Sequence, residues 1–256
     1  MDNRPIGVFD SGLGGLSILK TLTRAFPYED FIYVADLKNC PYGVKTKAQI
    51  AEYVSDISDY LVKRDVKAIV IACNTATANS QHLHLSIPVI GMIQATAKEA
   101  MQYRNRGSSL VLATDATVQS HLYRKALNAY QIEAIEVACP TFVMLVEEGK
   151  METSESYRIV SEHLKPYQEL AIDSVILGCT HFGFLKQEIH NCLPDAVLVG
   201  GGVEVSRQLR HELEHQDAFA SDLRHGVVSL VTTGDRDEFK EKIQLMNMPY
   251  DEIRAI

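Results

Sequence analysis

Short runs of β-branched and other apolar residues alternate along this chain with longer segments whose apolar residues recur at helical spacing. This alternation is typical of β–α–β units, in which successive strands pair in parallel and helices cover the sheet. Strands are predicted over residues 5–9, 31–35, 67–72, 87–90, 109–113, 132–138, 174–178, 196–199 and 227–232. Amphipathic spacing predicts helices over residues 48–63, 118–130, 154–165 and 202–215.

Nine strands are more than one doubly wound sheet of modest size commonly holds, so we expect two α/β domains with mainly parallel sheets. The first domain is predicted to take residues 1–95 together with residues 205–256, and the second to take residues 96–204. No linker rich in Pro, Gly or Ser marks these boundaries. We therefore expect the domains to pack closely, with a cleft between them that holds the site.

The composition is that of an ordinary folded protein, with 256 residues, 46% hydrophobic content and a formal net charge of −8. An acidic chain without a cluster of Lys and Arg is not expected to bind nucleic acid. No apolar stretch approaches the roughly 20 residues that span a bilayer, and the first residues lack the basic-then-apolar layout of a signal peptide. These features predict a cytoplasmic protein with neither a nucleic-acid nor a membrane partner.

The five cysteines include no CxxC pair, so neither a disulfide framework nor a zinc or other metal site is predicted. Two of them follow short strands in the same way: Cys73 comes after residues 67–72, and Cys179 comes after residues 174–178. The carboxyl ends of strands form the ligand crevice in an open α/β sheet, and we expect these two thiols to face each other. The remaining cysteines lie in or beside apolar stretches and are interpreted as structural: Cys40, Cys139 and Cys192.

Polar residues at or beyond the other predicted strand ends complete the candidate site. Asp10 and Ser11 open a glycine-rich turn, which lets the backbone approach a ligand closely and favours an anion such as a carboxylate. The loop of Pro41, Tyr42 and Gly43 can present backbone amides to such a group. The glycines do not match a dinucleotide fingerprint and no Walker lysine follows, so no cofactor is expected.

Two cysteines in equivalent positions suggest a particular chemistry. One cysteine beside a histidine would suggest an acyl-transfer nucleophile, whereas two thiols on opposite sides of a carbon can remove a proton on one face and supply one on the other. That exchange inverts a stereocentre. The α-proton of an amino acid is far less acidic than a thiol of reference pKa about 8.5, so the site must hold the attacking cysteine as thiolate and stabilise the carbanion.

Together, these motifs resemble the glutamate racemase family, the cofactor-independent racemases that supply D-glutamate for peptidoglycan. The matching motifs are Phe9-Asp10-Ser11-Gly12-Leu13-Gly14-Gly15, Asp36 with Pro41-Tyr42-Gly43, Ala72-Cys73-Asn74-Thr75-Ala76, Ala138-Cys139-Pro140 to Glu147, and Gly178-Cys179-Thr180-His181. The resemblance implies two pseudo-symmetric α/β domains with glutamate in the cleft between them, no cofactor, and commonly a homodimer. The chain departs from the family's pattern at Gln94, Ala116, Gly183 and Gly200, none of which is a catalytic group there.

The resemblance also implies roles for individual residues. It makes Cys73 the acid–base that serves the D-enantiomer and Cys179 the one that serves the L-enantiomer. The implied catalytic helpers are Asp10, His181, Asp36 and Glu147. The implied substrate contacts are Asp10, Ser11, Pro41, Tyr42, Gly43, Asn74, Thr75, Thr114, Thr117, Thr180 and His181. Two alternatives stay open: an aspartate or broader amino-acid racemase of the same superfamily, and a non-catalytic relative that binds a small molecule.

Overall fold

The computed structural model describes residues 1–256, with Leu245 described by its backbone alone. The chain divides into two compact units. Unit 1 contains Met1–Met92 and Gly202–Ile256, and unit 2 contains Ile93–Gly201. The predicted domain boundaries, after residues 95 and 204, lie close to these two junctions. Each unit combines a parallel sheet with helices, as the α/β prediction requires.

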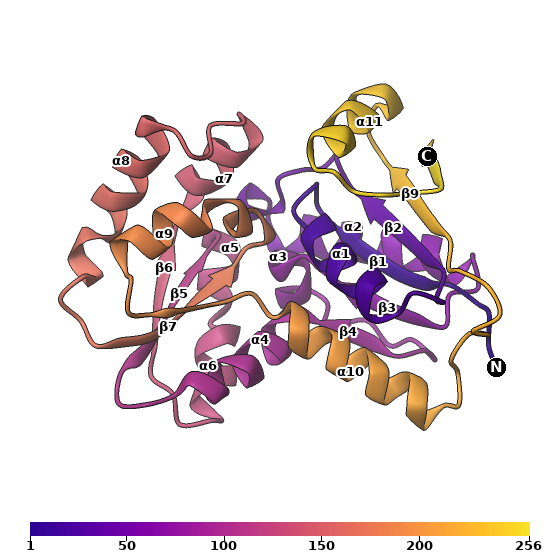
Figure 1. Cartoon of the computed structure of the whole chain (residues 1–256), viewed down its shortest axis with the longest axis horizontal. Helices are drawn as coiled ribbons and strands as arrows, with labels where there is room; N and C mark the ends of the chain where they lie inside the picture. The colour runs from indigo at the N-terminus through magenta and orange to yellow at the C-terminus, as the bar shows by residue number, and fades with distance from the viewer. The chain divides into compact units, whose positions relative to one another are not determined.

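Unit 1 is built on a six-stranded sheet in the order β10-β9-β2-β1-β3-β4, in which every neighbouring pair is parallel. Its strands are β1 (Ile6–Asp10), β2 (Phe31–Ala35), β3 (Ala68–Ile71), β4 (Val89–Gly91), β9 (Val228–Thr232) and β10 (Glu252–Ala255). Its helices are α1 (Leu16–Ala25), α2 (Lys47–Val62), α3 (Asn74–Ala78), α10 (Gly202–His215) and α11 (Arg236–Leu245), with a 3-10 turn η1 (Tyr42–Val44). Strands β1 and β3 are buried along their whole length, as central strands of a covered parallel sheet are. Figure 1 shows β1, β2, β3 and β9 side by side.

Unit 2 has a four-stranded parallel sheet in the order β6-β5-β7-β8. Its strands are β5 (Ser108–Ala113), β6 (Ala134–Ala138), β7 (Ile172–Gly178) and β8 (Val197–Val199). Its helices are α4, which begins in unit 1 (Met92–Ala100), α5 (Asp115–Ser120), α6 (Leu122–Asn128), α7 (Pro140–Glu147), α8 (Ser154–Leu164) and α9 (Lys186–Cys192), with 3-10 turns η2 (Met101–Tyr103), η3 (Lys165–Tyr167) and η4 (Thr180–Leu185). Alternate residues of β5 and β7 pack with α7, α8, η4 and α9 in one buried apolar core, which also contains Cys139 and Cys179.

The two sheets share a topology. The order β2-β1-β3-β4 in unit 1 is repeated as β6-β5-β7-β8 in unit 2, with each strand replaced by the one four places later in the chain. In unit 1, β1 lies between β2 and β3, and β3 leads into Cys73. In unit 2, β5 lies between β6 and β7, and β7 leads into Cys179. This repeat is the pseudo-symmetry that the resemblance implies.

Two of the differences between the structure and the predicted elements have a local physical cause. The single helix expected over residues 118–130 is two helices, α5 and α6, because His121 between them has a φ of +53° and a left-handed residue cannot continue a right-handed helix. Strand β10 was not predicted; it adds to the edge of the sheet beside β9 and is largely exposed, so its sequence lacks an apolar run. In the part of the chain that the structure describes, no helix is long and apolar enough to cross a bilayer.

Candidate active site

Cys73 lies at the carboxyl edge of the unit 1 sheet, beside Ser11. Phe9 of β1 pairs with Ile71 of β3, and Ser11 and Cys73 each follow two residues later, so the register brings them together. The Cys73 Sγ donates to the Ser11 Oγ over 3.7 Å. Cys73 is also the N-cap residue of α3, where its sulfur accepts the Ala76 N–H at 3.4 Å. A backbone donor aimed at the sulfur favours the thiolate over the thiol.

Asp10 is fully buried at the end of β1, next to this pair. Its Oδ1 accepts the Gly12 N–H at 2.9 Å. Gly15 leaves room for it, because a Cβ at that position would come within 2.5 Å of the Asp10 Cβ. The Tyr33 hydroxyl donates to the Gly12 carbonyl at 2.7 Å and closes the turn. Burial, followed by the negative charges of Asp10 and Cys73, raises the pKa of Tyr33 well above its usual value.

Asp36, at the end of β2, holds the loop that follows it. Its Oδ2 accepts the Tyr42 hydroxyl at 2.6 Å and its Oδ1 accepts the Thr233 hydroxyl at 2.6 Å, while the Asn39 amide donates to both oxygens. Tyr42 is buried, and burial together with the Asp36 charge raises its pKa. The carboxylate thus fixes the place of Tyr42 at the start of η1.

The rest of the predicted unit 1 contacts gather around the first turn of α3. Asn74 and Thr75 are buried there, and η1, which contains Tyr42 and Gly43, lies against α3. Pro41 precedes η1 and follows Cys40 through a cis peptide bond. Unit 1 therefore brings all of its predicted site residues to the carboxyl ends of β1, β2 and β3.

Cys179 occupies in unit 2 the place that Cys73 has in unit 1. Ala113 of β5 pairs with Gly178 of β7, and Thr114 and Cys179 are the next residue on each strand. Thr114 caps α5: its hydroxyl oxygen accepts the Thr117 N–H at 3.3 Å, and its hydroxyl donates to the Thr117 Oγ1 at 3.0 Å. Both threonines are buried, as is Thr180 beside the cysteine.

A chain of three side chains runs from the Cys179 sulfur. The His181 Nδ1 lies 3.6 Å from the Cys179 Sγ, and the His181 Nε2 lies 2.6 Å from the Glu147 Oε1. A carboxylate only accepts hydrogen bonds, so in the neutral ring the Nε2–H donates to Glu147 and Nδ1 faces the sulfur as an acceptor. His181 is buried, whereas the Glu147 side chain is 29% exposed. A base is thus placed next to the thiol and oriented by a third group.

Cys139, expected to be structural, is buried and is the unit 2 counterpart of Asp36. Burial raises its pKa to about 12, and the charge of Cys179 acts in the same direction. It does have a polar neighbour that the sequence did not indicate, since the His163 Nε2 lies 3.4 Å from its sulfur. Cys40 and Cys192 are half-buried. Among the described residues, His, Cys, Asp and Glu side chains form no group of three suited to a metal ion.

A model of the Asp/Glu/hydantoin racemase family matches residues 6–206, which include both cysteine motifs. The chain belongs to this family. It is 37% identical over 247 residues to a glutamate racemase of Lactococcus lactis, covering 94% of this chain and 91% of the relative. It is 41% identical to a glutamate racemase of Streptococcus pneumoniae, covering 82% of this chain and 81% of the relative.

Solved structures of racemases agree with the family assignment. A glutamate racemase of Bacillus anthracis superposes with a TM-score of 0.94 at 31% identity, covering 100% of this chain and 98% of the other. A glutamate racemase of Francisella tularensis, solved in complex with D-glutamate, gives a TM-score of 0.91 at 31% identity with the same coverage. An aspartate racemase of Picrophilus torridus, at 15% identity and a TM-score of 0.65, shares the fold.

This racemase-family site contains residues that the sequence analysis missed. Asn39 and Thr233 hold Asp36, and Tyr33 packs against the Asp10 turn. In unit 2, Tyr123 is fully buried, is hydrogen-bonded to Thr96, and has its pKa raised mainly by burial and further by the charge of Cys179. Thr233 follows the end of β9, so the same rule of polar residues at strand ends that selected Thr114 would have found it. Nothing in the sequence around the two tyrosines sets them apart from ordinary core residues.

Proposed function

We propose that this chain is a glutamate racemase that interconverts L- and D-glutamate by proton transfer between Cα and two cysteines. The observation that carries the proposal is the equivalence of Cys73 and Cys179: each is the first polar residue beyond a central strand, with a hydroxyl residue in register on the neighbouring strand. A binding protein gains nothing from two such thiols, whereas inversion of a stereocentre needs one proton donor and one acceptor. The glutamate specificity rests on the relatives.

Cys179 is the proposed base for the L-enantiomer. In the resting site its thiol proton can pass to the His181 Nδ1, which leaves a thiolate beside an imidazolium. The Glu147 carboxylate, 2.6 Å from Nε2, stabilises that imidazolium. The thiolate then removes the α-proton of L-glutamate and leaves a carbanion, to which the Cys73 thiol next donates its proton on the opposite face, so that D-glutamate forms and Cys73 is left as the thiolate.

Cys73 performs the reverse reaction on the D-enantiomer. The Ala76 N–H donates to its sulfur, and the Ser11 hydroxyl, which accepts from the thiol, can turn to donate once Cys73 is a thiolate. Asp10, buried at the end of the neighbouring strand, is the proposed helper on this side. Asp36 is proposed to act through Tyr42, because its hydrogen bonds are directed at the loop that contains Tyr42 and Gly43.

Substrate binding is proposed to use the buried polar residues at both sheet edges. Backbone amides at the Ser11 turn and near Tyr42, together with the side chains of Asn74 and Thr75, suit a carboxylate. Thr114, Thr117 and Thr180 supply hydroxyls on the unit 2 side. The reaction requires the two thiols to reach opposite faces of one Cα. We further propose a cytoplasmic homodimer that supplies D-glutamate for peptidoglycan.

The direct test follows the loss of optical activity with pure L-glutamate and, separately, with pure D-glutamate, on chelator-treated protein. The proposal predicts that both enantiomers converge on an equal mixture. Aspartate serves as the second substrate: racemisation of aspartate without glutamate would favour the broader racemase. Binding of glutamate by calorimetry without any change of rotation would favour the non-catalytic relative.

A further inference from the structure

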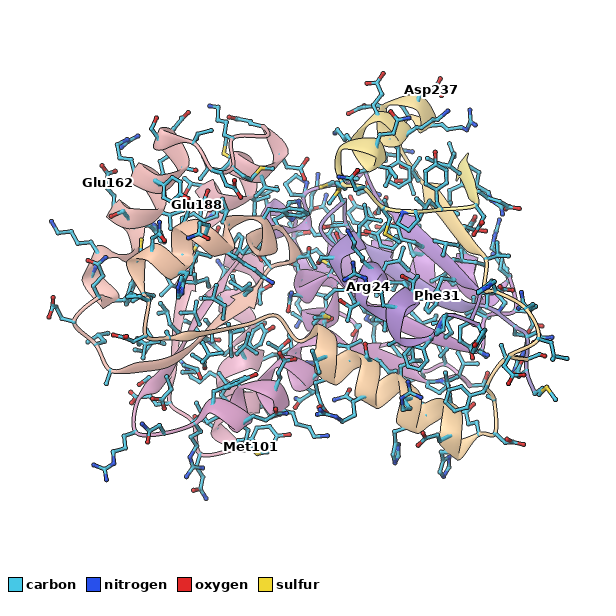
Figure 2. All side chains as sticks on the ribbon, viewed as in Figure 1. Arg24, Phe31, Met101, Glu162, Glu188 and Asp237 are labelled. Carbon is cyan, nitrogen blue, oxygen red and sulfur yellow. The ribbon has the colours of Figure 1, made fainter. Side chains whose placement is uncertain are left out.

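Glu188 is a buried carboxylate on α9 that the reaction does not use. It is fully inaccessible to solvent, and its Oε1 accepts two hydrogen bonds, from the Glu152 N–H at 2.7 Å and from the Ser156 hydroxyl at 2.8 Å. Its Oε2 has no hydrogen-bond partner among the described groups. Figure 2 labels Glu188 on α9 and Glu162 on α8, and the Glu162 side chain is exposed. A buried carboxylate is costly to retain unless its contacts do something that an apolar side chain cannot.

The Glu188 hydrogen bonds connect two parts of the chain, one of which follows His181 and the other Glu147. These two residues are the partners of the hydrogen bond beside Cys179. Glu188 lies on α9, which continues directly from η4, and η4 contains His181. Glu152 belongs to the segment 148–153 that connects α7 to α8, and Glu147 is the last residue of α7. The carboxylate therefore joins the element that presents His181 to the segment that follows Glu147.

The backbone of segment 148–153 depends on this contact. Helix α7 ends with the Gly149 N–H bonded to the Val146 carbonyl and the Lys150 N–H bonded to the Leu145 carbonyl, which fixes Glu147 in the last turn. Glu152 then has a φ of +57°, a left-handed conformation that a glutamate adopts only when its surroundings hold it there. The bond from its N–H to Glu188 supplies that restraint.

We infer that Glu188 is a positioning residue for the racemisation: by holding segment 148–153 against α9, it keeps the Glu147 carboxylate on the His181 Nε2, and so keeps His181 in the tautomer that faces Cys179. This inference rests on the proposed function for its catalytic consequence. The geometric part does not, because the state of the His181 ring can be observed without substrate.

The test compares Glu188→Leu, which removes the acceptor, with Glu188→Gln, which keeps one oxygen as acceptor. The first readout is the downfield proton resonance of the His181 Nε2–H in substrate-free protein, assigned by its loss in Glu147→Ala, which removes the acceptor. Glu188→Leu is expected to lose or broaden this signal and to lower kcat by about ten- to hundredfold, while Glu188→Gln retains both. In the Leu variant, the primary isotope effect with Cα-deuterated L-glutamate should rise and that with D-glutamate should fall, because only the Cys179 step is slowed.

Two control variants separate positioning from stability. Val160→Ala removes apolar volume from the same core on α8 without touching the carboxylate and should lower the melting temperature while leaving the His181 signal and the isotope effects unchanged. Glu162 is exposed on the same helix, and Glu162→Leu should change neither the melting temperature nor the His181 signal. The inference is overturned if Glu188→Leu keeps the His181 signal, or if Val160→Ala loses it equally. If Glu188→Leu does not fold, Ser156→Ala is used in its place, because it removes one of the two donors to Glu188. A weakened His181 signal is then expected, and an unchanged His181 signal would contradict the inference. A wild type inactive on glutamate would refute the proposed function and leave the spectroscopic test standing.

Discussion

Asp36 and Cys139 occupy the same position in the two sheets, the first residue after β2 and after β6. The Asp36 N–H donates to the Asp10 carbonyl at 3.0 Å, and the Cys139 N–H donates to the Ala113 carbonyl at 2.8 Å. The two units use this position differently. In unit 1 it contains a charged group that organises a loop, whereas in unit 2 it contains a neutral thiol packed in the apolar core.

Cys139 is expected to resist alkylation in the folded protein although it lies near Cys179. Its pKa of about 12 means that the neutral thiol persists until the pH rises towards that value, so at pH 8.5 fewer than about one molecule in a thousand carries the thiolate. Iodoacetamide labelling followed by peptide mass spectrometry should find Cys139 unmodified in native protein and modified in urea. Rapid native labelling at this position would contradict the assignment of Cys139 as a buried, neutral thiol.

Removing the Asp36 side chain is expected to weaken substrate binding more than turnover. Asp36→Ala leaves the buried Tyr42 hydroxyl without its acceptor, at a cost of about 1–3 kcal/mol, and frees the loop. KM for glutamate should rise in this variant while kcat changes less. Asp36→Asn keeps one carbonyl oxygen, so its KM should lie between those of the wild type and Asp36→Ala. A kcat lower by about a hundredfold or more at unchanged KM would instead support a direct acid–base role for Asp36.

The ion pair of Lys67 and Glu29 is expected to be the most sensitive polar pair for stability. Both side chains are buried, their charged atoms lie 2.5 Å apart, and the Lys67 ammonium also donates to the Asp2 and Ala218 carbonyls at 2.7 Å each. Lys67→Met leaves the Glu29 charge uncompensated and should lower the free energy of unfolding by about 3–5 kcal/mol. Urea denaturation measures this, with Lys63→Met, at an exposed position, as the matched control. A loss no larger than that of the control would show that the pair contributes nothing net.

Gly149 is expected to be required for its backbone conformation alone. Its φ is +68°, and a Cβ added there would meet nothing within 4 Å, so the cost of Gly149→Ala is the cost of a left-handed alanine, about 1 kcal/mol. The thermal midpoint should fall accordingly. Gly200→Ala, where a Cβ also has open space and φ is not positive, is the control and should leave it unchanged. Equal midpoints for the two variants would show that the end of α7 can rearrange without cost.

The sequence was sufficient for the parallel α/β class and for all nine predicted strands, because buried parallel strands form short apolar runs that periodicity detects. It also predicted α10 with its observed bounds, since the apolar residues of that helix recur on one face. It missed the break at His121, because a left-handed residue other than glycine leaves no sequence signal. It missed β10 for a different reason: an exposed edge strand needs few apolar residues.

Within the site, the strand-end rule found the cysteines and most of their polar neighbours because parallel strands present these positions at one edge. The rule could not show that His181 bonds Glu147, since 34 residues separate them and only packing brings them together. Glu188 was missed as well. A glutamate in a helix is normally exposed, and its burial follows from the contact between α8 and α9 rather than from any local pattern.

The central claim, proton exchange by two separate thiols, is tested most directly by early product analysis in D2O. Starting from L-glutamate with protium at Cα, the two-base account predicts that the first D-glutamate formed carries deuterium while the unreacted L-glutamate keeps its protium, because the proton removed by Cys179 is not the one returned by Cys73. Cys73→Ser and Cys179→Ser should each abolish racemisation. Product that retains the original proton, or full activity in either variant, would contradict the account.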